Sequence, residues 1–173
     1  MKIKSNMKDN FLSIYNEARG IARHKRRIIK TGKASHLNFL EEIALYYSII
    51  MLMGMYIVTN PKLLNIYGYI LITLGLLYLL YNIVRIYEGY KFRKRQKFVS
   101  TIIIDEKGIT DITSFEGMEL LFKWKIIEAV VIKKYAVVIL TKGKIYFYFD
   151  IKNKESIINE IKKYKKNIKI IDA

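Results

Sequence analysis

Two apolar stretches decide the fold: IALYYSIIMLMGMYIVT at residues 43–59 and LLNIYGYILITLGLLYLLYNIV at residues 63–84. Neither contains a charged side chain, whereas a surface helix of a soluble protein carries charges on one face. About 20 apolar residues in helical form cross the hydrocarbon core of a bilayer. We therefore predict two transmembrane helices at about 41–60 and 63–85, which the turn Asn60-Pro61-Lys62 joins into a hairpin at 41–86.

Basic residues lie on both outer flanks of this hairpin and account for much of the formal charge of +16. They are Arg19, Arg23, Lys25, Arg26, Arg27, Lys30 and Lys33 before it, and Arg85, Lys91, Arg93, Lys94, Arg95 and Lys97 after it. Because Lys and Arg are retained in the cytoplasm, we predict a multi-pass protein of the cell membrane with both termini cytoplasmic. The position of the charge favours the lipid bilayer and its anionic headgroups over nucleic acid as a partner.

Small residues recur on one face of each predicted helix. Ala44 and Ser48 are four residues apart, and Gly68 and Gly75 are seven apart. Small side chains allow two helix backbones to approach closely within a membrane. We expect this face to join the two helices of the hairpin, with a homo-oligomer contact as the alternative.

Residues 1–40 contain a basic amphipathic segment that we predict to be cytoplasmic and separate. Apolar residues recur at helical spacing from Phe11 to Ala22, and Arg19, Arg23, Arg26 and Arg27 fill the other side. Such a helix either lies in the inner-leaflet interface or packs on the C-terminal domain. Gly32 predicts a break before the first span.

Beyond residue 97 the pattern changes to short runs rich in Ile, Val, Phe and Tyr, which predict β-strands. The runs are 98–104, 108–113, 118–124, 126–132, 136–141 and 144–149, with turn signals at 105–108, Glu116-Gly117 and 141–144. Asn153 is a predicted N-cap for a final helix with its apolar stripe at Ile157, Ile158, Ile161 and Tyr164. Residues 97–173 therefore predict a small antiparallel β domain closed by a helix, and the whole chain an α+β membrane protein.

Three stretches of this domain carry a family resemblance: TIIIDEKGIT at 101–110, FKWKIIEAVVIKKYAVVIL at 122–140 and KIYFYFDIKNKESIINEIKKY at 144–164. Together with the two preceding spans, they resemble the YcxB-like family, whose C-terminal domain resembles bacterial pleckstrin-homology (PH) domains. The resemblance implies a PH-like fold for residues 97–173. The chain departs from the family in having no proline between the last strand and the helix, and in its long basic segment before the first span.

The residue types needed for catalysis or metal binding do not form a recognisable pattern. The chain contains no cysteine, which excludes disulfides and thiolate ligands. Its two histidines, His24 and His36, have no metal-site spacing around them, and no serine stands in a G-x-S-x-G context. The sequence therefore predicts a protein that is not an enzyme and that has no metal or cofactor.

Basic side chains are the candidate contacts to a membrane surface or a partner. They are Arg19, Arg23, Arg26, Arg27, Arg93, Arg95, Lys123, Lys125, Lys133 and Lys134. Together with Lys142 and Lys144, the lysines of the β domain could form a basic surface that faces the membrane, and an ordinary solvated surface is the alternative. Trp124 could stack on a ligand, but alternation with Leu120 and Phe122 predicts that it belongs to the core.

Three functions are compatible with this organisation. The first is a non-enzymatic binding or scaffolding module at the inner leaflet, which the hairpin anchors and which binds lipid headgroups or a protein. The second is an immunity or self-resistance protein against a bacteriocin or secreted toxin, which the resemblance suggests by analogy. The third is a subunit of a membrane secretion or transport complex.

Overall fold

A computed structural model of the chain describes residues 1–33, 38–60, 65–112 and 119–172. The predicted turns at Pro61 and at Glu116-Gly117, and His36, lie outside the described residues. The fold is α+β, and the chain divides into two compact units. One unit combines Met1–Asn38 with Arg93–Ala173, and we call it the domain; the other is Phe39–Phe92.

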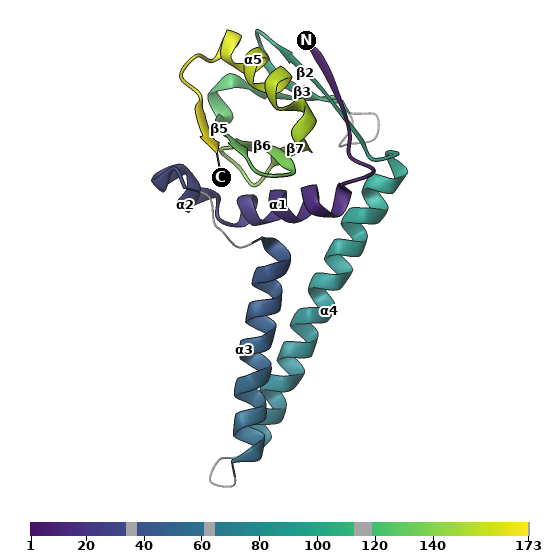
Figure 1. The fold of residues 1–173 in the computed structure, drawn as a ribbon, viewed down its shortest axis with the longest axis vertical. Helices are drawn as coiled ribbons and strands as arrows, with labels where there is room; N and C mark the ends of the chain where they lie inside the picture. Colours follow the sequence, from purple (N-terminus) through teal and green to yellow (C-terminus); the bar gives the residue numbers. More distant parts are fainter. Residues whose placement is uncertain (34–37, 61–64, 113–118, 173) are drawn as a thin grey trace. The chain divides into compact units, whose positions relative to one another are not determined.

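Two long helices, α3 (Phe39–Thr59) and α4 (Asn65–Arg95), follow the two apolar stretches (Figure 1). Their most apolar windows have mean hydropathies of 1.6 and 1.8, so both are long and apolar enough to cross a membrane. Helix α4 continues past the predicted end near residue 85, because the basic run 86–95 contains no helix-breaking proline.

The end of α4 has the hydrogen-bond pattern of a Schellman motif. The N–H of Phe98 donates to the Arg93 carbonyl at 2.8 Å, and the N–H of Lys97 donates to the Lys94 carbonyl at 3.0 Å. Lys97 and Phe98 both adopt left-handed backbone conformations, with φ of 53° and 57°. The chain thereby turns from the helix into the first strand of the β domain.

The first sheet has the strand order β1-β2-β3-β4 and is antiparallel throughout. Its strands are β1 (Lys2–Asn6), β2 (Val99–Asp105), β3 (Gly108–Asp111) and β4 (Leu120–Lys123). Asp105 stabilises the predicted β2–β3 turn, since its Oδ1 accepts from the N–H groups of Lys107 at 2.9 Å and Gly108 at 3.2 Å. Gly108 has φ of +148°, and an added Cβ would collide with the Phe122 backbone on β4.

The second sheet has the order β7-β6-β5-β8. Its strands are β5 (Ile127–Ile132), β6 (Ala136–Thr141), β7 (Tyr146–Asp150) and β8 (Lys169–Asp172). Strands β5, β6 and β7 are antiparallel, as predicted, whereas β8 lies parallel to β5. The single predicted run of six strands is thus two four-stranded sheets, and each contains one strand that the sequence reading missed.

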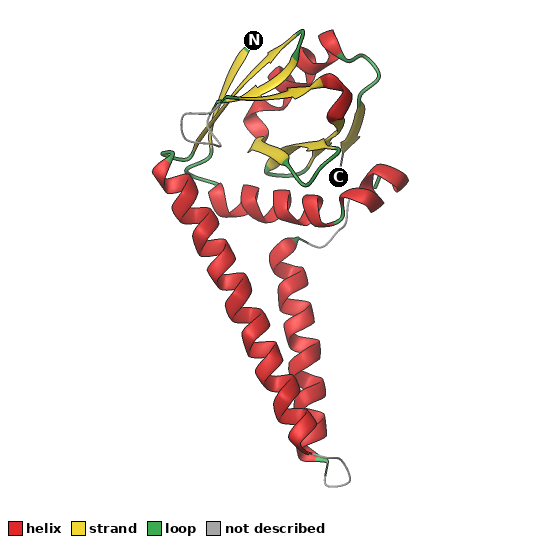
Figure 2. Cartoon of the chain, turned by 180° about the vertical axis from the view of Figure 1, so that it is seen from behind, coloured by secondary structure: helices red, strands yellow, loops and turns green. Residues whose placement is uncertain are grey.

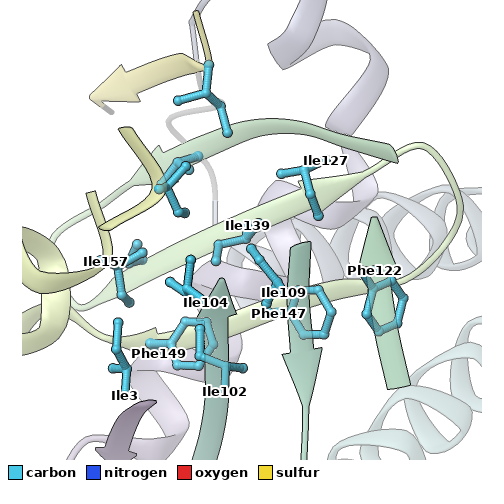
Figure 3. Packing of buried hydrophobic residues seen from close by; sticks show 14 of the residues in the cluster. Ile3, Ile102, Ile104, Ile109, Phe122, Ile127, Ile139, Phe147, Phe149 and Ile157 are labelled. Atoms are coloured by element: carbon cyan, nitrogen blue, oxygen red, sulfur yellow. The ribbon is translucent and has the colours of Figure 1, made fainter. Parts of the chain in front are cut away.

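The main core lies between the two sheets, where the alternating inward residues of both meet (Figure 3). Ile102 and Ile104 of the first sheet, and Ile139 and Phe149 of the second, are fully buried. The helix α5 (Lys154–Tyr164) contributes Ile157 to this core and follows the short 3-10 helix η2 (Ile151–Asn153). The predicted C-terminal helix is confirmed, with Asn153 at its N-cap position but without a side-chain capping bond.

The N-terminal segment is part of the domain rather than a separate piece, which corrects the predicted division at residue 40. Strand β1 pairs with β2, with Ile3 opposite Ile102. Helix α1 (Phe11–Arg23) packs on β6 and β7 with a buried apolar face that includes Ile14 and Ala18. Of the two alternatives for this helix, the structure has the packed one (Figure 2). Helix α2 (Lys25–Thr31) follows and ends at Gly32, the predicted break, with φ of 71°.

Packing of α1 explains why every residue of β6 is buried. Val137 and Ile139 face the core between the sheets, so the alternate residues Ala136, Val138 and Leu140 face the other side, where α1 lies. A strand covered on both faces reads as a continuous apolar run, which is the pattern AVVIL shows.

Candidate functional site

The basic residues predicted as surface contacts differ in exposure. Those that are exposed are Arg23, Arg26, Arg27, Arg95, Lys123, Lys125 and Lys134, and those that are half-buried are Arg19 and Lys133. The prediction is wrong for Arg93, which is 6% exposed. Sequence position beside the hairpin suggested a headgroup contact, but the last turn of α4 turns this side chain into the domain.

Arg93 forms a buried contact with Tyr148 on β7. Its Nε donates to the Tyr148 hydroxyl at 2.9 Å, and its guanidinium carbon lies 4.7 Å from the centre of the same ring. Its Nη1 also donates to Gln96 Oε1 at 3.2 Å. A buried guanidinium is stabilised by such hydrogen bonds and by the face of an aromatic ring. The contact joins the end of α4 to the second sheet.

Arg19 belongs to an aromatic cluster between α1 and β7. The ring centres of Tyr15 and Tyr148 are 6.4 Å apart, and those of Tyr146 and Tyr148 are 6.0 Å apart. The Arg19 guanidinium lies 5.9 Å from the Tyr15 ring centre and hydrogen-bonds Tyr146. Burial raises the pKa of Tyr146 to about 12, although the Arg19 charge opposes the increase. Tyr146 therefore remains protonated at neutral pH, and the aromatic cluster packs the helix on the sheet.

Glu17, in the middle of α1, connects this helix to the turn between β5 and β6 and was not singled out from the sequence. Its Oε2 accepts from the N–H of Tyr135 at 2.8 Å, in the turn between β5 and β6. Burial raises the pKa of Glu17, and the Tyr135 N–H together with the neighbouring Lys133 and Lys134 lower it in part. A carboxylate on the apolar stripe beside Ile14, Ala18 and Ile21 was the available sequence signal.

Asn38, the residue just before α3, forms a hydrogen bond with the turn between β5 and β6. Lys133 Nζ donates to Asn38 Oδ1 at 2.5 Å. Lys133 therefore has a structural contact within the domain and is only half-exposed.

A second group of lysines gathers at the opposite end of β5 and β6, and three of its members, Lys125, Lys142 and Lys144, were predicted from the sequence as surface contacts. We call Lys25, Lys125, Lys142, Lys144 and Lys165 the lysine cluster. Lys25 Nζ donates to the carbonyl oxygens of Thr141 and Gly143 and pairs with Glu128 at 2.7 Å. Lys165 Nζ donates to the carbonyls of Trp124 at 2.9 Å and Ile127 at 2.5 Å.

Burial lowers the pKa of Lys165, and the nearby charge of Lys142 lowers it further. The remaining members, Lys125, Lys142 and Lys144, are exposed. This end of the sheet therefore concentrates positive charge, with Glu128 as the carboxylate that pairs with Lys25. The six β residues that separate it from Lys133 and Lys134 correspond to about 20 Å.

Trp124 lies at the edge of the core, immediately after β4 in the 3-10 helix η1 (Trp124–Ile126). It packs against the core cluster, stacks on Tyr164 at 5.9 Å, and its indole N–H donates to the Asp105 carbonyl at 3.0 Å. Phe122 is buried while Leu121 and Lys123 are exposed, which is the predicted alternation. The indole thus links η1, α5 and the β2–β3 turn.

In the hairpin unit, α3 and α4 approach each other closely at two glycines. A Cβ added to Gly68 would lie 2.8 Å from the Gly54 carbonyl oxygen, and one added to Gly75 would lie 3.1 Å from Ile50 Cγ2. Ala44 and Ser48 are exposed, so Gly54 takes the place predicted for them on α3. Glycine permits the shortest separation, because it has no side chain between the backbones.

Among the described residues, no three His, Cys, Asp or Glu side chains come together as metal ligands. Comparisons with protein-family models, with curated proteins and with solved structures found no match to this chain.

Proposed function

We propose that the chain is a two-span integral membrane protein whose domain is a non-enzymatic binding or scaffolding module at the inner leaflet of the cell membrane. The observation that carries this proposal is the exposure of α3 and α4. Only 17% and 11% of their most apolar windows are buried, whereas the core helix of a soluble protein would be mostly buried.

The free energy of transferring these exposed apolar side chains out of water supports lipid as the environment of the two helices. Large apolar side chains such as Leu52, Ile66 and Leu80 are more than half exposed. Removing one such side chain from water is worth about 1.5–3 kcal/mol. Even at the lower value, ten of them amount to about 15 kcal/mol, which is the upper end of ordinary folding stability. In a bilayer these side chains contact acyl chains instead of water, so this unfavourable exposure does not arise.

The connectivity of the chain supports the proposal that both ends of the hairpin lie on the same side of the membrane. Strand β1 precedes the hairpin and β2 follows it, yet the two strands pair directly, with Ser5 opposite Ser100. A sheet cannot form across a bilayer, because its hydrogen-bonded strands lie about 4.8 Å apart. The basic flanks then favour the cytoplasm as that side. The domain is also proposed to be YcxB-like and PH-like, which the closing helix α5 supports.

The absence of cysteine makes a topology test direct, since a single introduced cysteine is the only thiol in the chain. We expect Asn60→Cys, at the end of α3, to react with a membrane-impermeant maleimide in intact cells. Lys107→Cys, in the exposed β2–β3 turn, should react only after the cells are permeabilised.

Two results would contradict the proposal. Release of the chain from vesicles by alkaline carbonate would exclude membrane spans, and labelling of Lys107→Cys in intact cells would place the domain outside. Binding by the domain is tested by purifying the chain in mild detergent. We expect a specific protein or lipid to co-purify with the wild type, and to be lost when exposed lysines of the domain are changed to glutamate.

A further inference from the structure

The β6–β7 turn, which we call the tip, has an unusual composition for an exposed turn. Its residues Lys142, Gly143, Lys144 and Ile145 are all exposed, and Ile145 is 45% exposed although it is apolar. Two ammonium groups therefore flank an exposed branched aliphatic side chain. Peripheral membrane segments combine these two features, with basic groups on phosphates and apolar groups among the acyl chains.

Several hydrogen bonds hold the tip in place. Lys25 of α2 donates to the carbonyls of Thr141 and Gly143. The Thr141 hydroxyl donates to the Ile145 carbonyl at 2.6 Å, and the N–H of Lys142 donates to the Ile126 carbonyl at 2.7 Å. A turn fixed in this way loses little conformational entropy when it binds.

The charge around the tip is strongly positive. The lysine cluster contributes five ammonium groups, of which Lys25 pairs with Glu128. Lys25 and Lys165 are directed at backbone carbonyls, while Lys125, Lys142 and Lys144 extend into solvent. A basic group near an anionic leaflet strengthens membrane association by about fivefold.

We infer that the tip is the part of the domain that touches the membrane, with Lys142 and Lys144 on lipid phosphates and Ile145 in the interface. This inference rests on the proposed function, because the hairpin keeps the domain close to the bilayer. At such a high effective concentration, a few weak contacts suffice to hold the tip against the lipid. Ile145 favours a lipid surface over a soluble acidic partner, since an ammonium group alone would serve the latter.

The test uses the full chain in nanodiscs, with Ile145→Cys carrying an environment-sensitive NBD fluorophore as the only label. In discs that contain phosphatidylglycerol, we expect blue-shifted emission and quenching by nitroxide-labelled lipids. Both signals should decrease in phosphatidylcholine discs and at high salt. The double change Lys142→Glu with Lys144→Glu should weaken the lipid-dependent signal by 25-fold or more, at about fivefold for each charge removed. Glu106→Cys, in the exposed turn of the other sheet, is the matched control and should report water throughout.

Equal water exposure of the Ile145→Cys probe in both kinds of disc would overturn the inference. Shielding by added inorganic polyphosphate in phosphatidylcholine discs, without any effect of phosphatidylglycerol, would assign the tip to a soluble polyanion and also overturn it. Both results leave the two-span topology intact, since incorporation into discs and the Asn60→Cys labelling are measured separately. Failure of the chain to enter discs would instead contradict the proposed function.

Discussion

The Nε of Arg93 donates a 2.9 Å hydrogen bond to the hydroxyl of Tyr148, 55 residues further along the chain. Arg93 is in the last turn of α4 and Tyr148 is in the middle of β7, so the contact spans helix and sheet. A buried guanidinium that loses its acceptor keeps the full cost of desolvation.

The change Tyr148→Phe therefore tests this contact, because it keeps the ring and removes only the hydroxyl. We expect a loss of about 1.5–3 kcal/mol in the stability of the domain, since the bond is made by a charged donor. The loss should appear as a decrease of several degrees in the melting temperature of the detergent-solubilised chain. Tyr164→Phe is the control, since Tyr164 is 39% exposed and its stacking on Trp124 is retained. Equal losses in the two variants would contradict a role for the hydroxyl.

Glu17 predicts a pH-dependent difference between two substitutions. Because burial raises the pKa of Glu17 in the folded state, folding takes up a proton between the unfolded value of 4.5 and the raised value. Protonation of the Glu17 carboxyl therefore increases the stability of the folded state as the pH falls through the folded pKa. This contribution is complete below pH 4.5. Glu17→Gln keeps an acceptor for the Tyr135 N–H without the charge, so at pH 7 it should be at least as stable as the wild type.

On acidification towards pH 4, the wild type should gain stability relative to Glu17→Gln, as measured by thermal unfolding. Glu17→Ala leaves the Tyr135 N–H without this acceptor and, since neither variant titrates at position 17, should be about 1–3 kcal/mol less stable than Glu17→Gln at either pH. A difference between wild type and Glu17→Gln that stays constant with pH would show that the carboxyl titrates alike in both states.

Lys97 has a left-handed backbone, at the position of a Schellman motif that glycine usually occupies. A side chain there costs about 1–2 kcal/mol relative to glycine. Lys97→Gly should therefore raise the melting temperature by a few degrees, even though glycine loses more entropy on folding. Lys97→Ala removes the same long side chain and keeps the Cβ, so it should give no such gain.

Close approach of α3 and α4 is testable with paired cysteines. Ile50→Cys with Gly75→Cys should form a disulfide in membranes, because a Cβ at position 75 lies 3.1 Å from the Ile50 side chain. Adding Gly68→Leu should abolish it, since the added Cβ would lie 2.8 Å from the Gly54 carbonyl oxygen. Ile50→Cys with Leu76→Cys is the control pair, because Leu76 is 50% exposed and should not cross-link.

Sequence reasoning found the elements whose signal is local. The alternation of β4, the Asp105 turn and the Gly32 helix end were all predictable from neighbouring residues. Strands β1 and β8 were not, because each is four or five residues long and has its partner far away in the sequence. With one apolar residue, Ile3, the stretch KIKSN carries no strand signal on its own.

The candidate surface residues also divide into features that the local sequence reveals and features that depend on distant parts of the chain. Abundance of lysine and arginine was plain from the sequence, but burial of Arg93 depends on the path of the chain after α4. Lys25 and Lys142 are 117 residues apart and come together only because α2 packs beside the end of β6. Gly54 was overlooked because single glycines in apolar helices are common, and its importance depends on Gly68 opposite it.

Pairing of β1 with β2 also imposes an order on biosynthesis. Residues 2–6 are translated before α3 and α4, but the strand that completes their hydrogen bonds is translated only after both of these helices. The nascent strand β1 therefore remains without a β-sheet partner while both apolar helices emerge from the ribosome. Maturation of the domain is consequently a late event, and a chain truncated within α4 would expose Ile3 and the apolar face of α1 to cellular proteases.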